Sequence, residues 1–254
     1  MKPRFRMFAG PNGSGKTVLF EQLRRENIIH TEFYIGADRI ETDLKNYRKF
    51  HFNAYHVQSD HYEFIEHIRR SGLFTIAPDK SFIDHLRIEQ GVLHVDLEEN
   101  QIDSYLASFI SSYVTEKLLQ SGQSFCLETV LSHASKLDLF ELAKKSGYQT
   151  YLYFICTENF NLNIERVKLR VAGGGHDVST EKIIERFNRS MHNFTIASEL
   201  ADVVYLIDNS VQFRLVLEVR NAQIANRIEN IPFWLFPFIP SRFRPAKGKK
   251  NRQY

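Results

Sequence analysis

The sequence has few cysteines and no long apolar run, and each shortage excludes a class of protein. Two cysteines, Cys126 and Cys156, in 254 residues cannot build a disulfide framework, and they show no C-x-x-C spacing for zinc. No segment is apolar for long enough to span a bilayer, and the first residues lack the apolar region of a signal peptide. We therefore expect a cytoplasmic protein with two reduced, buried thiols and no transmembrane segment.

Acidic residues are missing from one stretch, 241–254, which carries six basic residues. The rest of the chain has 27 basic and 30 acidic residues, so the net charge of +3 does not describe a basic body. The composition therefore argues against a nucleic-acid-binding surface on the body. We expect 241–254 to be a flexible basic tail, and any binding to nucleic acid or an anionic membrane to reside there.

Residues 10–17 read GPNGSGKT and match the phosphate-binding loop pattern G-x-x-x-x-G-K-[ST]. The glycines let successive backbone N–H groups point inward around phosphate oxygens. The preceding residues, 4–9, suit a short strand, and 16–27 have helical spacing, which is the context that the pattern requires. In such loops the lysine reaches the β- and γ-phosphates and the final hydroxyl is a ligand of Mg²⁺. The sequence predicts that ATP and Mg²⁺ bind through Gly10, Pro11, Asn12, Gly13, Ser14, Gly15, Lys16 and Thr17, with Thr17 on the metal.

Strand-like and helical stretches alternate along most of the chain. This order predicts an α/β fold, a P-loop NTPase-type three-layer sandwich with a mainly parallel sheet. Residues 43–100 differ, because they show helical patterns at 59–72 and 80–91 and no second motif; we expect a helical insertion there, placed to cap a substrate. We expect a single domain over 1–240. The expected strands are 32–38, 124–129, 148–156 and 203–210, and the expected helices are 101–122, 135–147, 161–176 and 179–200.

Polar residues end several of the expected strands, where parallel sheets bind their ligands. These are Asp38 at the end of the second strand, Glu128 and Thr129 at the end of the third, and Asp208 at the end of the last. Each could instead form a turn or cap a helix.

Two arginines follow at helical spacing. Arg166 and Arg170 stand four residues apart, so both guanidinium groups leave one face of a helix. An arginine in that position can stabilise the charge that spreads over a phosphoryl group in transfer. The alternative is a solvated helix face shared with Lys168.

Several strings in a fixed order resemble the zeta toxin family of P-loop kinases, in particular its chromosomal branch of predicted ATPases. After GPNGSGKT they are A37-D38, LETVLSH (127–133), ERVKLRVAGGGH (165–176), IERFNRS (184–190) and IDNS (207–210). The resemblance covers 4–42 and 105–215. It implies ATP-dependent phosphorylation of a hydroxyl on a UDP-N-acetylamino sugar, and it allows for an antitoxin partner.

The resemblance also assigns roles to residues. It implies that Asp38 is the general base, that Glu128 and Thr129 contact the substrate, and that Arg166 contacts the phosphates. Zeta toxins carry another arginine just before the next helix, where this sequence has His176.

Other residues could take the place of that second arginine. Arg170 lies one helical turn from Arg166, and Arg186 and Arg189 form a further pair on the next predicted helix. The three glycines at 173–175 could bind an anion, act as a hinge or simply end the helix.

Two questions stay open at this stage. The acceptor could be a nucleotide-sugar, but the same loop and aspartate also suit a nucleotide or polynucleotide kinase, and a regulatory module that binds ATP without transferring phosphate is the alternative outside enzymes. The aromatic segment 231–240 could dock on the body or contact a partner or a membrane surface.

Overall fold

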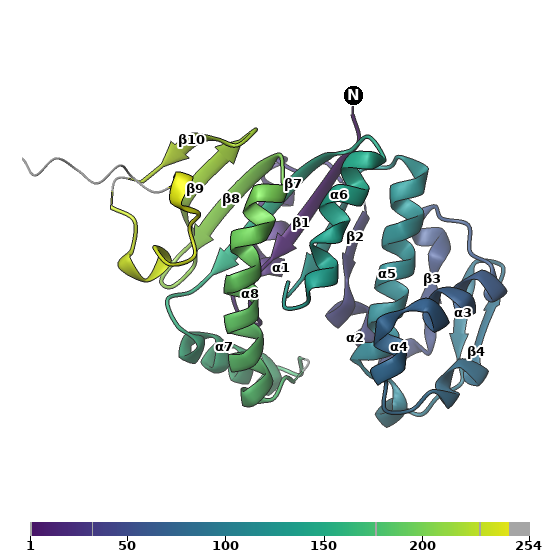
Figure 1. Cartoon of the computed structure of the whole chain (residues 1–254). Coiled ribbons are helices and arrows are strands. Elements are labelled where there is room, and N and C mark those ends of the chain that lie inside the picture. The colour runs from purple at the N-terminus through teal and green to yellow at the C-terminus, as the bar shows by residue number, and fades with distance from the viewer. Residues whose placement is uncertain (1, 32, 176, 229, 244–254) are drawn as a thin grey trace, which may run out of the picture.

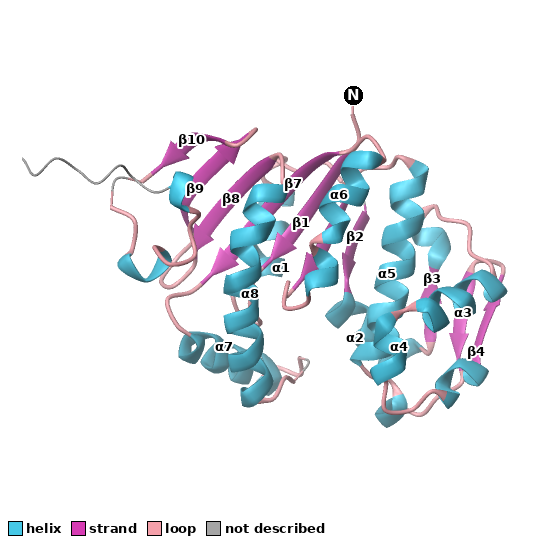
Figure 2. Cartoon of the chain, in the orientation of Figure 1, coloured by secondary structure: helices cyan, strands magenta, loops and turns pink. Residues whose placement is uncertain are grey.

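A computed structural model describes residues 2–31, 33–175, 177–228 and 230–243. In this described part a seven-stranded sheet forms the centre of the molecule, with strand order β10-β9-β8-β7-β1-β6-β2 (Figures 1 and 2). The five strands β8, β7, β1, β6 and β2 run parallel, as the sequence predicts. At the other edge, β9 pairs antiparallel with β8, and β10 pairs antiparallel with β9. The strands are β1 (Arg4–Ala9), β2 (Phe33–Gly36), β6 (Phe125–Thr129), β7 (Gln149–Cys156), β8 (Val203–Asp208), β9 (Arg214–Arg220) and β10 (Gln223–Arg227).

Helices cover both faces of this sheet and complete the predicted three layers (Figure 1). One face carries α5 (Ser104–Ser121), α6 (Asp138–Lys145) and α8 (Thr180–Leu200), over the larger apolar cluster of the core. The opposite face carries α1 (Lys16–Arg25), over a smaller cluster that includes Phe8, Phe20 and Ile155. The central strands are apolar on both faces because helices bury both.

The insertion contains a small sheet, so the predicted helix over 80–91 is wrong. Strands β3 (Lys49–His51), β5 (Val92–Val95) and β4 (Leu86–Glu89) pair antiparallel in that order, beside the helices α3 (His61–Arg70) and α4 (Gly72–Ile76). The reason is the turn between the last two strands: Gln90 and Gly91 have φ values of 50° and 77°. Two residues with positive φ make the tight hairpin turn that matches strand twist. The expectation of a purely helical insertion is corrected accordingly.

The main sheet also extends beyond the strand expected to be its last. After β8 the chain turns back into β9 and β10, neither of which the sequence-based pattern included. Asn221 and Ala222, with φ values of 47° and 61°, form the turn between them. The parallel core therefore ends in an antiparallel hairpin at one edge.

The aromatic segment that follows β10 docks on the body. Ile231, Leu235 and Ile239 are buried against the core, and the Thr195 hydroxyl of α8 donates to the carbonyl of Phe238 at 2.9 Å. Phe233, by contrast, is 89% exposed. The first of the two alternatives for 231–240 therefore holds for most of its side chains. Within the predicted tail, 244–254 lies outside the described residues.

Both cysteines are free and buried, as predicted. Burial raises the pKa of the Cys126 thiol to about 12 and that of Cys156 well above its ordinary value. In the described part of the chain, helices are all too short or too polar to cross a membrane.

Candidate functional site

The phosphate-binding loop connects β1 to α1 and fits against its neighbours too closely for side chains at its glycines. A Cβ on Gly10 would lie 1.9 Å from the carbonyl oxygen of Ile155 in β7, and one on Gly13 would lie 2.6 Å from the carbonyl oxygen of Asn163. Gly15, with φ 98°, stands just before the first residue of α1. The backbone therefore curls into a cradle at a helix N-terminus, which is an anion-binding arrangement.

Lys16 is buried and rests on the loop itself. Its Nζ donates to the carbonyl oxygens of Gly10 at 3.0 Å and Pro11 at 3.1 Å, and lies 3.9 Å from Oε1 of Glu128. Burial lowers the pKa of Lys16, while the carboxylates of Glu128 and Asp38 act in the opposite direction. A triphosphate would offer this ammonium stronger, charged acceptors than the two carbonyls. Ser14 Oγ, buried and without a partner among the described residues, is a further donor for a phosphate oxygen.

Glu128 lies at the end of β6, directly beside β1, and its carboxylate meets Thr17. The Thr17 hydroxyl donates to Oε2 of Glu128 at 2.8 Å, and the hydroxyl of Tyr34 in β2 donates to the same oxygen. Burial and the neighbouring carboxylate raise the pKa of Tyr34, so this phenol stays a donor. A hydroxyl beside a carboxylate is an oxygen donor set that suits Mg²⁺. Thr17 and Glu128 are therefore the residues that would hold the ion.

The other two polar strand ends have local roles. The hydroxyl of Thr129 accepts from the N–H of Leu131 at 3.2 Å, within the turn that follows β6. Asp208 accepts from the backbone and side chain of Ser210 and pairs with Arg214 at 3.2 Å. These contacts are those of turn residues, which is the alternative noted for such positions.

Asp38 does not end a strand, which corrects the sequence-based placement. β2 ends at Gly36, and Asp38 is the second residue of α2 (Ala37–Tyr47). Its side chain is 46% exposed, and Oδ2 lies 3.8 Å from Nη1 of Arg170 on α7 (Phe160–Ala172). A carboxylate at this helix start, close enough to Lys16 to affect its pKa, is accessible to an incoming hydroxyl.

The two predicted arginines point to different places. Nη2 of Arg166 donates to the carbonyl of Ser210, beyond β8, at 3.2 Å, and its Nη1 is buried with no partner in the described part of the chain. Arg170 instead faces Asp38. Arg186 on α8 is close enough to Lys16 to lower its pKa, whereas Arg189 pairs at the surface with Glu185. His176 lies outside the described residues.

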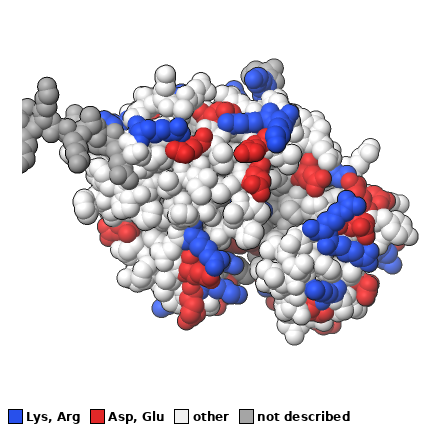
Figure 3. Space-filling model, in the orientation of Figure 1, with Lys and Arg blue, Asp and Glu red and all other residues white. Residues whose placement is uncertain are grey.

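Sequence-based reasoning missed two asparagines that hold the loop. The Nδ2 of Asn163 donates to the carbonyl of Asn12 at 2.5 Å, and the Nδ2 of Asn209 donates to the carbonyl of Ser14 at 2.8 Å. Asn209 stands in the string IDNS (207–210) and Asn163 in the helix expected over 161–176, but an asparagine in a helix or after a strand predicts nothing about a distant loop. The surface is hollowed between the part over α7 and α8 and the part over the insertion (Figure 3).

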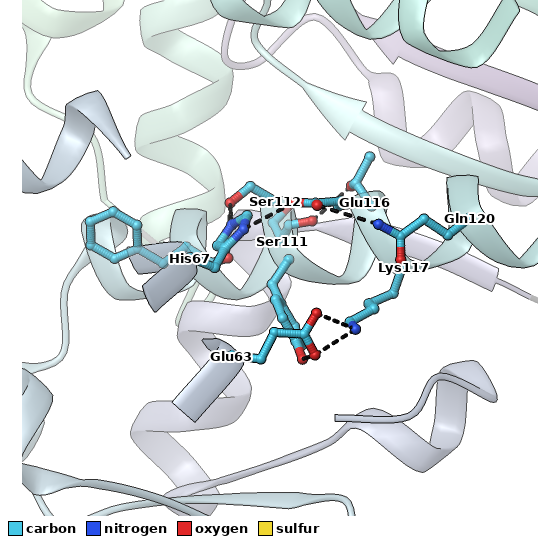
Figure 4. A network of polar contacts seen from close by, with 10 residues as sticks. Glu63, His67, Ser111, Ser112, Glu116, Lys117 and Gln120 are labelled. Atoms are coloured by element: carbon cyan, nitrogen blue, oxygen red, sulfur yellow. Dashed lines mark hydrogen bonds and ion pairs between the residues drawn. The ribbon is translucent and has the colours of Figure 1, made fainter. Parts of the chain in front are cut away.

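A second polar network joins α3 to α5 (Figure 4). Nε2 of His67 lies 2.7 Å from Oγ of Ser112, and Nδ1 lies 3.1 Å from Oε2 of Glu116. The residue types are those of a hydrolase triad, but Ser112 also donates to the carbonyl of Phe109 in its own helix, at 2.9 Å. Burial lowers the pKa of His67. The network is a brace between two helices.

Part of the sequence matches a known protein family. Residues 98–218 match the model of the zeta toxin family, a stretch that begins after the phosphate-binding loop and Asp38. No curated protein matches the sequence.

Solved structures of other proteins resemble the fold of this chain to different degrees. Two are complexes of AvrRxo1-ORF1 with AvrRxo1-ORF2, one with sulphate ions (TM-score 0.57) and one with ATP (TM-score 0.56). Each is 15% identical over 98% of this chain, and this chain spans 66% of the matched chain. A third, from the PezAT chromosomal toxin–antitoxin system of Streptococcus pneumoniae, has a TM-score of 0.48 at 16% identity, over 85% of this chain and 71% of that one. The chain thus has the α/β fold with a mainly parallel central sheet that the sequence predicts, and its residues 98–218 match the model of the zeta toxin family.

Proposed function

We propose that this protein is an ATP-dependent kinase of the zeta toxin type, which transfers the γ-phosphate to a hydroxyl of a small-molecule acceptor. One observation carries the proposal: Asp38, outside the phosphate-binding loop but close enough to Lys16 to affect its pKa, is 46% exposed and lies 3.8 Å from Arg170. A module that only binds ATP does not need a carboxylate there. A kinase needs a base for the hydroxyl and positive charge for the phosphate.

In this proposal, different residues bind the phosphates, stabilise the transferred group and accept the proton. Lys16 and the loop N–H groups would hold the phosphates, and Arg170 would stabilise the charge of the transferred group. Asp38 would accept the hydroxyl proton as the acceptor oxygen bonds to the γ-phosphorus and the bond to ADP breaks. Mg²⁺, when bound, would neutralise charge on the phosphates.

Glu128 takes a different role in this proposal from the one that the family resemblance implies. The resemblance gives Glu128 and Thr129 to the acceptor. The 2.8 Å contact between Thr17 and Glu128 supports a role at the metal, and Thr129 belongs to a turn. We therefore assign Mg²⁺ to Thr17 and Glu128 jointly.

The acceptor and the partner are proposals of a finer kind. A nucleotide-sugar such as a UDP-amino sugar follows from the family resemblance, and residues 43–100, most of which lie outside the family match, would shape its pocket. An antitoxin partner follows from the family resemblance, and the matched complex of AvrRxo1-ORF1 with AvrRxo1-ORF2, which belongs to another protein, shows a partner chain on a similar fold. A nucleotide or polynucleotide kinase is the alternative acceptor class.

The experiment is acceptor-dependent ADP release. Purified protein with Mg-ATP is supplied with separate fractions of sugar nucleotides, nucleosides and 5′-hydroxyl oligonucleotides, and phosphorylated product is identified by mass spectrometry. We expect stimulation by sugar nucleotides and its loss in Lys16→Ala, because the substitution removes the ammonium that would meet the phosphates. Unchanged binding of an ATP analogue by Lys16→Ala would overturn the loop assignment. Equal, low ADP release with every fraction would favour the regulatory module.

A further inference from the structure

Helix α7 is joined to the phosphate-binding loop by one buried side chain, Asn163. Its Nδ2 donates to the carbonyl of Asn12 at 2.5 Å, and its Oδ1 accepts from the hydroxyl of Thr157, the residue after β7. The side chain is fully buried, and both ends of the amide have a partner. A buried amide is costly unless it is hydrogen-bonded in this way.

The backbone of the helix reinforces this junction. A Cβ on Gly13 would lie 2.6 Å from the carbonyl oxygen of Asn163 and 3.1 Å from its Cα. The first turn of α7 is therefore in close contact with the loop at Gly13, and the position of one constrains the other.

The junction between Asn163 and the loop also affects the two arginines of α7, because of their spacing along the helix. Arg166 and Arg170 follow Asn163 by three and seven residues, so all three side chains start from the same face of the helix, although the two guanidinium groups reach different neighbours. A rotation or a slide of α7 would carry both guanidinium groups away from Ser210 and Asp38, their present neighbours.

We infer that Asn163 is a positioning residue, which registers α7 on the phosphate-binding loop so that Arg166 and Arg170 meet the nucleotide; the inference rests on the proposed function. The Asn163 side chain is fully buried and both ends of its amide are bonded within the protein, so it would not contact phosphate or acceptor itself. An apolar side chain would suit a buried helical position better, and what asparagine adds is the bond to the loop.

The test is a double-mutant cycle on binding of a non-hydrolysable ATP analogue with Mg²⁺. The cycle combines Asn163→Ala with Arg170→Ala. Asn209→Ala, which removes a similar amide bond to the loop at Ser14 without touching α7, is the matched comparison. Asn161→Ala, at an exposed site of the same helix, controls for general effects on α7.

Asn163→Ala should weaken analogue binding about tenfold in the wild-type background and less than about threefold beside Arg170→Ala, because the lost arginine can no longer be misplaced. Asn209→Ala should weaken binding by the same factor in both backgrounds, and Asn161→Ala should not weaken it. Equal effects of Asn163→Ala in both backgrounds would show that it only stabilises the fold, and would overturn the inference.

Two further measurements make the result of the cycle interpretable. Thermal unfolding shows whether Asn163→Ala folds; if it does not, Thr157→Val, which removes the partner of Oδ1 and keeps Asn163, takes its place in the cycle with the same criteria. The binding readout needs no acceptor and no transfer. If the kinase assay fails but the effects of Asn163→Ala and Arg170→Ala on analogue binding are coupled, only the proposed function is refuted. If the kinase assay succeeds but the two effects are additive, only the positioning role of Asn163 is refuted.

Discussion

Asp38→Asn gives the sharpest test of the proposed chemistry, because the structure predicts that it harms catalysis far more than folding. Asparagine has the same shape but accepts a proton poorly, so the hydroxyl loses its base. General base catalysis contributes about 10²–10⁴-fold to a rate. That range corresponds to about 3–5 kcal/mol in the activation barrier. We expect kcat to fall by that factor with little change in KM for either substrate.

The cost to stability is small for two reasons that the geometry supplies. The ion pair with Arg170 is long, at 3.8 Å, and both side chains are more than a third exposed, so screening leaves it about 0–1 kcal/mol. The position of Asp38 in the first turn of α2 contributes about 0.3–1 kcal/mol through the helix dipole. The sum is small beside the roughly 5–15 kcal/mol by which domains are stable. The variant should stay folded.

The assay is steady-state ADP formation with the acceptor at saturating and limiting concentrations, alongside thermal unfolding of each variant. Asp43→Asn is the matched control, because Asp43 lies on the same helix, is 49% exposed and pairs with Arg39 at 4.0 Å. We expect it to keep full kcat. Near-full kcat in Asp38→Asn, or an equal loss in Asp43→Asn, would refute the assignment of Asp38 as the base.

Three further predictions test other parts of the structure. Glu128→Gln should raise the Mg²⁺ concentration for half-maximal activity while KM for the acceptor stays close to wild type; a rise confined to the acceptor KM would return Glu128 to substrate binding. Gly10→Ala should abolish ATP-analogue binding and destabilise the fold by about 1–3 kcal/mol, because its Cβ would lie 1.9 Å from the carbonyl of Ile155; unaltered calorimetric binding would contradict the tight loop. Burial lowers the pKa of His67 in the folded protein below its ordinary value of 6.5. Below about pH 6.5 the unfolded chain therefore binds a proton at His67 more readily than the folded protein does, so the free energy of unfolding falls as the pH falls. Urea unfolding at pH 7 and pH 5 should therefore show a smaller loss of stability in His67→Gln than in wild type, and equal losses would refute this.

Local sequence determined the parts of this protein that depend on short-range chemistry. GPNGSGKT specifies a loop whose glycines no other residue can replace, and the flanking strand and helix follow from residues next to them. The parallel order of the main strands follows from the alternation of strands and helices, since each crossover needs a helix. The strings that resemble zeta toxins could be recognised from the sequence because they too are short runs with fixed spacing.

Local pattern failed where two states have similar propensity or where the decisive neighbour is distant. Residues 80–91 could form a helix alone, and the pairing of β4 with β5 through the turn at Gln90 and Gly91 decided for a strand. Asp38 was expected at a strand end, but the strand stops two residues earlier, and boundaries depend on which ladder bonds the neighbour can supply.

Only the tertiary structure decided which polar residues meet. Thr17 and Glu128 are 111 positions apart, Asn12 and Asn163 are 151 apart, and the sheet order places each pair in contact. A polar residue at a strand end or on a helix predicts a candidate, but its partner is set by packing across the sheet. The sequence therefore determined the phosphate-binding loop pattern and the layered fold. The packing of α7 and β6 on that loop decided which groups the arginines and Glu128 contact, because hydrogen bonds between distant segments exist only once the core has brought them together.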